Sequence, residues 1–189
     1  ASYMSYANEH MPTDAPLAQL LTGQVAVLDQ EDIFLLQNRN YGGSQYDTHS
    51  DGSGVSYSSR LRPILNMRPN YQSWLGGHGS SLWQLNADTH IIDWLNARGF
   101  DCDCITDEDL HYEGVAALEG YDVVLTGSHP EYWSTPMWNG LEAFRHRGGR
   151  LMYLGANGWY WHVAYHDQEP GIMEVRRGED GIRAWAAEP

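Results

Sequence analysis

The sequence predicts an α/β fold built on a doubly wound, mostly parallel, flavodoxin-like sheet. The first observation is that β-rich apolar runs at Cys102–Ile105, Tyr121–Leu125 and Arg150–Leu154 alternate with helical patterns. The second is that turn residues separate these runs, so that β-α-β units with right-handed crossovers follow one another. We expect all 189 residues to form one domain that carries a long loop insertion at residues 38–84.

The N-terminal part of the chain is expected to be less regular. Residues 2–7, SYMSYA, alternate small and aromatic residues and are predicted to form a first strand. Ile33–Leu36 reads as a short edge strand or one helical turn, and Arg62–Met67 as a further strand. Between them, Asn38–Arg60 is rich in Gly, Ser, Asn, Tyr and Asp. A loop of this length in a compact domain is usually functional or mobile.

Regular alternation begins at Leu85. The stretch 85–98 places apolar residues on a helical stripe that ends at Gly99. Thr106, followed by three acidic residues, predicts the N-terminus of a short helix. A second helix is predicted over about Thr135–His146.

The C-terminal part is predicted to be β-rich. From Trp159 onward the pattern WYWHVAYH fits either an aromatic strand or the start of a helix. IMEVRR and IRAWAA resemble two antiparallel strands joined by the turn at 178–181.

Composition limits the partners and the compartment. A net charge of −14 disfavours nucleic acid and anionic membranes as partners. No apolar run reaches the roughly 18 residues that a membrane span requires. Cys102 and Cys104 lie two apart in a predicted strand, where a disulfide is poorly shaped, so both are expected to be reduced core residues in a cytoplasmic protein. The lack of an initiator Met suggests a fragment of a longer polypeptide.

The strongest candidate site follows the predicted central strand. Ser128, His129, Glu131 and Tyr132 come directly after it, at the edge where open α/β sheets bind ligands. These residues rarely converge on one another as a serine triad, but His129, Glu131 and Tyr132 offer nitrogen and oxygen donors to a metal. The alternative is a polar loop whose aromatic residues pack on the sheet.

A second candidate is Leu154–Gly158, LGANG, which has the shape of a nucleophile elbow without its Ser or Cys. Asn157 either donates a hydrogen bond to a substrate carbonyl or merely forms the turn. Asp47–Gly54 resembles a calcium loop, but its twelfth position is Ser58 instead of Glu, so calcium is not expected. Dinucleotide, P-loop and standard zinc motifs are absent from the sequence.

Four segments together resemble the C-terminal domain of the N,N-dimethylformamidase large subunit: GFDCDCITDEDLHYEG, YDVVLTGSHPEYW, GGRLMYLGANGWYWH and MEVRRGEDGIRAWAAEP. The opening SYMSYANEH also fits. The resemblance implies a glutamine-amidotransferase-like domain and a mononuclear ferric iron, held by two tyrosines and one glutamate, that hydrolyses a small amide. It also implies a homo- or hetero-oligomer.

The resemblance assigns Tyr132 as one iron ligand. It leaves the second tyrosine open, with Tyr71 and Tyr112 as candidates, and it places the glutamate beyond Pro189. His129, Glu131 and Asn157 are the expected catalytic residues: a carboxylate would take the proton of water, while His129 and Asn157 orient the substrate or the oxyanion.

The sequence also supports a function of another class. Aromatic residues make up 12% of the chain, more than a core needs, and they suggest a pocket or an interface. The domain could therefore be a non-catalytic module that recognises carbohydrate or a partner subunit through the aromatic loops around Tyr71, Trp74, Trp83 and Trp159–Trp161.

Overall fold

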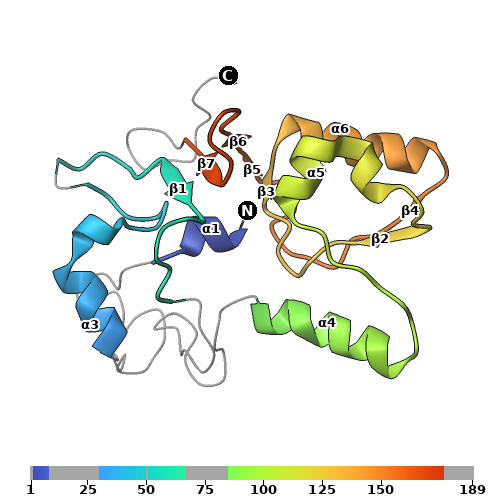
Figure 1. Cartoon of the computed structure of the whole chain (residues 1–189), viewed down its shortest axis with the longest axis horizontal. Helices are drawn as coiled ribbons and strands as arrows, with labels where there is room; N and C mark the ends of the chain where they lie inside the picture. Colours follow the sequence, from blue (N-terminus) through green and yellow to red (C-terminus); the bar gives the residue numbers. More distant parts are fainter. Residues whose placement is uncertain (1, 9–29, 50, 67–84, 177–189) are drawn as a thin grey trace.

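The structure, a computed structural model, describes residues 2–8, 30–49, 51–66 and 85–176 (Figure 1). The longer helices are α3 (Gln30–Gln37), α4 (Leu85–Ala97), α5 (Asp107–Glu113) and α6 (Thr135–His146). Shorter helical segments are α1 (Ser2–Tyr6), η1 (Arg39–Tyr41) and η2 (Gly114–Leu118). The strands are β1 (Tyr57–Ser59), β2 (Val123–Leu125), β3 (Tyr132–Trp133), β4 (Arg150–Met152), β5 (Trp161–His162), β6 (Ala164–Tyr165) and β7 (Ile172–Glu174).

The strands form three small sheets in the described part of the chain. The pairs β2–β4 and β3–β5 are parallel, with Val124 opposite Leu151 and Tyr132 opposite Trp161. The third sheet is antiparallel, in the order β1-β7-β6. The mixed α/β class is therefore confirmed, but one doubly wound flavodoxin-like sheet is not observed among the described residues.

Two predicted strands are absent from the described residues because they lack a pairing partner. Residues 101–106 are irregular, and Cys102 and Cys104 are exposed free thiols instead of core residues. In a strand the alternation of Asp with Cys would put both cysteines on one face, but that face offers only two small side chains for burial. Residues 62–66 are also irregular, since the Arg62 guanidinium crosses to the carbonyls of Gly42 and Ala7.

The prediction of a first strand at residues 2–7 is wrong, because Ser2–Tyr6 is helix α1. Its alternation of small and aromatic residues does not separate an apolar from a polar face, so the periodicity was ambiguous. Tertiary contacts decide the outcome: Ser58 Oγ on β1 donates to the Met4 carbonyl at 2.6 Å. The two undecided segments are also settled, Ile33–Leu36 as part of α3 and WYWHVAYH as strands β5 and β6.

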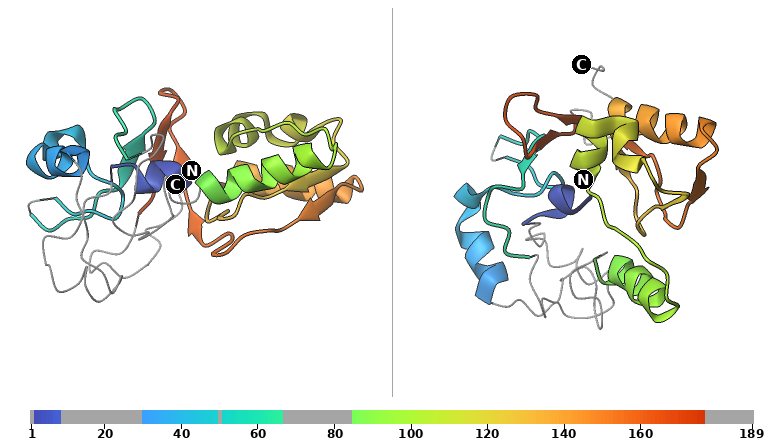
Figure 2. Two further views of the ribbon diagram at one scale, coloured as in Figure 1. Left: turned by 90° about the horizontal axis from the view of Figure 1, so that it is seen from below. Right: turned by 45° about the vertical axis from the view of Figure 1, so that its right-hand side comes forward.

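Helices α5 and α6 lie on one side of the β2–β4 pair, and α4 lies beyond the other side (Figure 2). The predicted apolar stripe of α4 is only half-buried, and none of its described residues is buried. Val123 at the start of β2 is 38% exposed, so the strand that we predicted to be central is an edge. Among the described residues β2 pairs with β4 alone, which explains this exposure.

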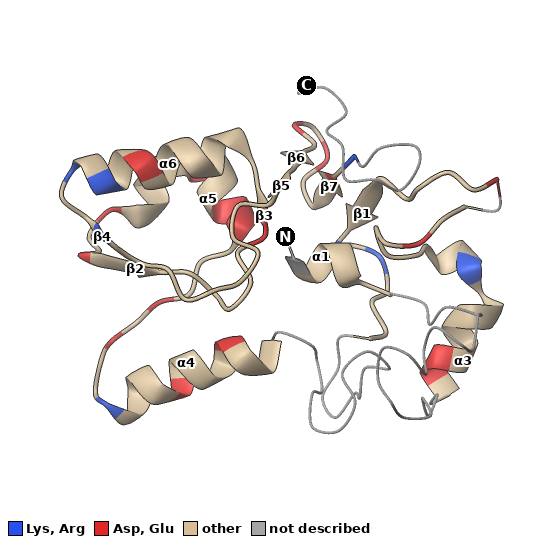
Figure 3. Cartoon of the chain, turned by 180° about the vertical axis from the view of Figure 1, so that it is seen from behind, with Lys and Arg blue, Asp and Glu red and all other residues tan. Residues whose placement is uncertain are grey.

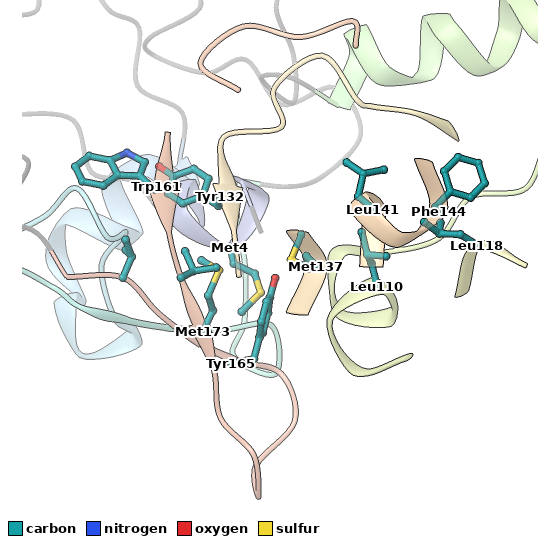
Figure 4. Close-up of a cluster of buried hydrophobic side chains, with 12 residues drawn as sticks. Met4, Leu110, Leu118, Tyr132, Met137, Leu141, Phe144, Trp161, Tyr165 and Met173 are labelled. Carbon is teal, nitrogen blue, oxygen red and sulfur yellow. The ribbon is translucent and has the colours of Figure 1, made fainter. Parts of the chain in front are cut away.

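The core joins α6 to the segment that carries β5–β7 (Figure 4). Met137, Leu141 and Phe144 of α6 follow a helical spacing and are buried. Gly140 lies on the side facing η2, where a Cβ would come within 2.9 Å of the Gly114 carbonyl carbon. The predicted helix Thr135–His146 therefore agrees with the structure at both ends.

We expect the Ser134→Ala variant to lose about 1 to 2 kcal/mol of unfolding free energy. Ser134 is the N-cap of α6; its buried Oγ accepts from the Met137 amide and also pairs with His111 Nδ1 at 2.7 Å. Burial lowers the pKa of His111 and favours its neutral ring. In the variant, Nδ1 of this ring would lose its hydrogen-bond partner, which adds to the cost. The urea midpoint measures the effect. Thr89→Ala, at an exposed position of α4, is the control and should change the midpoint little.

Candidate functional site

Four oxygen-bearing side chains from distant parts of the chain converge at one place: Tyr6, Tyr46, Glu131 and Tyr132. The Tyr46 hydroxyl donates to that of Tyr6 at 3.1 Å and also forms a very short contact with the Tyr132 hydroxyl. The Tyr6 hydroxyl lies 3.4 Å from Glu131 Oε2. The cluster thus contains three phenols and one carboxylate.

Three segments position the cluster. Tyr6 is the last residue of α1, Tyr46 lies in the polar loop after η1, and Tyr132 begins β3 directly after Glu131. The rings of Tyr6 and Tyr46 stack with centroids 4.7 Å apart and planes 14° apart.

Gln45 attaches the polar loop to α1 and the antiparallel sheet. Its amide donates to the Ser5 carbonyl at 2.9 Å, and its side chain accepts from Ser5 Oγ at 2.7 Å. Gln45 Nε2 also donates to the Ser56 carbonyl at 2.8 Å. Ser5 and Gln45 are both buried, so these bonds hold the neighbouring Tyr46 against Tyr6.

Two members of the cluster are shielded from solvent, and Tyr6 and Tyr46 are half-buried. Glu131 and Tyr132 are each 1% exposed. Burial, together with Tyr132, Tyr46 and Glu131, raises the pKa of Tyr6 far above the usual value of a phenol. Without a cation the phenol of Tyr6 therefore stays protonated, whereas a bound multivalent cation favours the phenolate.

The donor set suits a hard, highly charged metal ion. Phenolate and carboxylate oxygens are ligands for ferric iron, and three of the donors can become anionic by losing a phenolic proton. Among the described residues no group of three or more His, Cys, Asp or Glu side chains could hold a metal. The tyrosines therefore make this cluster the candidate metal centre of the described part of the chain.

Asp88 on α4 holds the loop that leads to Glu131. Its Oδ1 accepts from the Ser128 amide at 2.6 Å, and its Oδ2 accepts a very short hydrogen bond from the Tyr3 hydroxyl. Gly127 leaves room for this carboxylate, because a Cβ there would lie 3.1 Å from Asp88 Oδ1. One side chain thus ties α4 and α1 to the loop after β2.

A second segment, residues 154–161, supports the same loop from the other side. The amides of Ala156 and Trp159 donate to the carbonyls of Ser128 and Pro130 at 3.1 and 2.9 Å. The Trp161 amide donates to the Glu131 carbonyl at 2.8 Å. These bonds fix the backbone on which His129 and Glu131 are carried.

Two of the predicted catalytic residues approach each other. Asn157 Nδ2 lies 3.4 Å from His129 Nε2. Asn157 is exposed and has φ of 50°, a left-handed conformation that Asn tolerates, so it forms the turn of the elbow and also reaches His129. The bulkier Trp159 has φ of 54° beside it, a rare conformation that often marks a functional segment.

The other sequence candidates lie apart from the cluster. Tyr112 is exposed on α5 and donates to the His166 carbonyl at 3.1 Å. Tyr71 lies outside the described residues. In the calcium-like loop, Asp51 Oδ1 accepts from the Ser53 amide at 2.9 Å, and Asp47 Oδ2 accepts from the Ser44 amide at 2.6 Å. These carboxylates therefore stabilise turns.

Sequence reasoning found Glu131 and Tyr132 but missed Tyr6 and Tyr46 as members of the site. Tyr6 was assigned to a strand, and Tyr46 was one aromatic residue among many in the polar loop. The only local signal was an aromatic residue in the middle of a Gly- and Ser-rich loop.

Comparison with known proteins agrees with the resemblance. The family described as "N,N-dimethylformamidase beta subunit-like, C-terminal" matches residues 1–189. The chain is 48% identical over its whole length to the N,N-dimethylformamidase beta subunit of Paracoccus aminophilus and 47% identical to that of an Alcaligenes species. It spans 24% of each of these relatives, about a quarter of their length.

Among the described residues, no helix is both long and apolar enough to cross a membrane.

Proposed function

Because the chain belongs to the N,N-dimethylformamidase beta subunit-like, C-terminal family, we propose that it supplies an iron site for the hydrolysis of a small amide. The convergence of three phenols and one buried carboxylate is the observation that carries the proposal. The relatives' names support a formamide as substrate, and the residues of the site support an oxygen-bound ferric ion.

The contacts within the cluster suggest which residues hold the ion. Tyr6 contacts both Tyr46 and Glu131, and Tyr46 contacts both Tyr6 and Tyr132. Tyr6, Tyr46 and Glu131 therefore form a connected set of two tyrosines and one glutamate. In this assignment Tyr132, which the resemblance implied as a ligand, supports Tyr46 from the core, and Glu131 supplies the carboxylate that was expected beyond Pro189.

The bound ferric ion would supply Lewis acidity to the reaction. The remaining chemistry falls to His129 and Asn157, which lie on the two loops beside Glu131. In this proposal the Asn157 amide donates to a substrate carbonyl, and His129 Nε2 accepts a proton from water. Glu131 contributes to catalysis by binding the metal in this scheme, so the proton acceptor is His129.

The overall reaction balances with water as the only other reactant. The oxygen of water forms a new bond to the carbonyl carbon, and the bond between that carbon and nitrogen breaks. Both protons of water end on the nitrogen, so the products are a carboxylate and an ammonium ion. The domain must therefore release an anion and a cation.

Metal content and a visible spectrum of the full-length protein test the proposal. We expect about one iron per chain and a visible absorption band, because charge transfer from phenolate to ferric ion absorbs visible light. Hydrolysis of N,N-dimethylformamide should depend on that iron and return when iron is restored to the metal-free protein. A colourless protein that hydrolyses the amide without iron would refute the metal centre.

We also propose that the domain works within an assembly of subunits, since both relatives are named as beta subunits. Exposed aromatic residues support an interface, among them Trp94 and Phe100, whose stacked rings are each more than half exposed.

A further inference from the structure

A cavity of about 710 Å³ lies beside the candidate metal centre. His129 and Pro130, which directly precede Glu131, are part of its lining. Tyr3 and Met4 of α1, the helix that ends at Tyr6, line it as well. The cavity thus borders two of the segments that carry the metal centre, and a small formamide would fill only a small part of it.

Much of the lining is apolar, and its charged residues are mainly acidic. Asp88, Asp107 and Glu108 contribute carboxylates, and Figure 3 shows acidic residues gathered at the start of α5 beside α1. Asp109 also lines the cavity, but its carboxylate accepts from the Thr106 amide and hydroxyl in the capping box of α5. Arg60 is the cationic residue in the lining, and its Nε lies 3.0 Å from Glu108 Oε2.

Two buried polar atoms of this lining have no hydrogen-bond partner among the described residues. One is the hydroxyl of Tyr165, a side chain that is only 5% exposed. The other is Glu108 Oε1, the carboxylate oxygen that does not face Arg60. Buried polar groups are normally satisfied, so a pair of unsatisfied oxygens in one cavity points to a ligand that donates hydrogen bonds.

Three aromatic side chains define the rest of the ligand's chemistry. Tyr3, Trp133 and Tyr165 line the same cavity as the carboxylates. Aromatic rings next to carboxylates favour cations that carry apolar substituents, because a methylated ammonium ion interacts with ring faces while its N–H groups bind oxygen. A metal ion or an inorganic cation has no alkyl groups to pack against the rings.

We propose that this cavity binds the alkylammonium product of amide hydrolysis, with Glu108 Oε1 and the Tyr165 hydroxyl accepting hydrogen bonds from its nitrogen. This inference rests on the proposed function, because hydrolysis of an N-alkyl amide releases an amine that is protonated at neutral pH. The position of His129 in the lining connects the cavity to the place where the amine is formed.

Arg60 opposes this binding, so the proposal predicts that loss of its charge raises the affinity for the ammonium ion. Its guanidinium neutralises part of the Glu108 charge and repels an ammonium ion in the same cavity. Removing the Arg60 charge should tighten binding. A variant that only damages the fold would weaken it.

The test is titration of the full-length protein with dimethylammonium chloride. Calorimetry measures binding to the metal-free form, and product inhibition measures binding to the iron form. Potassium chloride at matched concentration corrects for ionic strength. Glu108→Gln removes the charge and Tyr165→Phe removes the hydroxyl, each with little change of shape. Glu113→Gln, an exposed carboxylate on the same helix, is the control.

We expect the dissociation constant of dimethylammonium to rise by roughly 10-fold in Glu108→Gln and by about 3-fold in Tyr165→Phe. It should fall by about 3-fold in Arg60→Gln. The control should match the parent protein. Absence of saturable binding by the parent, or equal binding by the parent and by the Glu108 and Tyr165 variants, would overturn the proposal.

The outcome separates this inference from the proposed function. Dimethylammonium binding with the expected pattern in a protein that hydrolyses no amide would support the cavity and reject the hydrolytic function. Iron-dependent hydrolysis without dimethylammonium binding would support the function and reject the cavity as an amine site.

Discussion

The Glu131→Gln variant is expected to lose its iron and to hydrolyse N,N-dimethylformamide at least ~1000-fold more slowly than the parent protein. Changes to residues that merely support a metal ligand cost roughly 10- to 100-fold, so loss of the only carboxylate in the cluster should cost more. Gln keeps the size of the side chain but has no negative charge for a ferric ion. Iron content and the rate of formate release measure the two effects.

The matched control is Glu142→Gln, which neutralises an exposed carboxylate on α6 and should leave both readings unchanged. If the Glu131 variant retains iron and activity, the carboxylate of the metal centre lies elsewhere in the protein.

Phenylalanine variants of the three tyrosines extend the same experiment. Tyr6→Phe and Tyr46→Phe should each lose iron, and with it the visible band, since each removes one of the three proposed ligands. Tyr132→Phe should keep the iron but shift the band, because it removes the hydroxyl that contacts Tyr46. Tyr41→Phe, at an exposed position, serves as the control. Loss of iron in the Tyr132 variant with retention in the Tyr6 variant would instead assign the ligand to Tyr132, as the resemblance implied.

The second large effect is expected from Gly155→Ala. A Cβ at this position would lie 2.1 Å from Pro130 Cδ and 2.9 Å from the Ser128 carbonyl oxygen. Neither neighbour can move without displacing the loop that carries His129 and Glu131. We expect a loss of about 3 kcal/mol of stability, at the upper end of the usual cost of overpacking, together with a severe loss of amide hydrolysis.

Gly54→Ala is the comparison for this variant. Gly54 is exposed, and a Cβ there would contact nothing within 4 Å. Its urea midpoint and activity should match those of the parent. Normal stability and activity in Gly155→Ala would show that the two loops are not held together as closely as the structure indicates.

The sequence alone determined the elements whose signals are local. Helix α6 begins after a Ser N-cap and carries apolar residues at helical spacing, so both of its ends were predicted. The capping box of Thr106 and Asp109 placed the start of α5 in the same way. The parallel direction of β2 and β4 also followed, because a helix connects the two apolar runs, although their direct pairing was not predicted.

Within the candidate site, local sequence identified His129, Glu131, Tyr132 and Asn157 because they follow strands or occupy a turn of recognisable shape. That His129 and Asn157 approach each other was decided by the hydrogen bonds between residues 154–161 and 128–131. The exposure of Val123 and of the two cysteines likewise depends on which strands pair, and a short apolar run does not specify its neighbours.

Tyr6 and Tyr46 show most clearly what only the tertiary structure decided. They lie 40 residues apart from each other and 125 and 86 residues from their partners Glu131 and Tyr132. The periodicity of a segment reports which of its faces is apolar, but not which distant loop packs against it. The hydrogen bonds of Gln45 and Ser5 bring the two rings together, and these long-range contacts form only when the whole domain folds. The sequence thus determined the chemical groups available to this protein, whereas the tertiary structure decided which of them share a site.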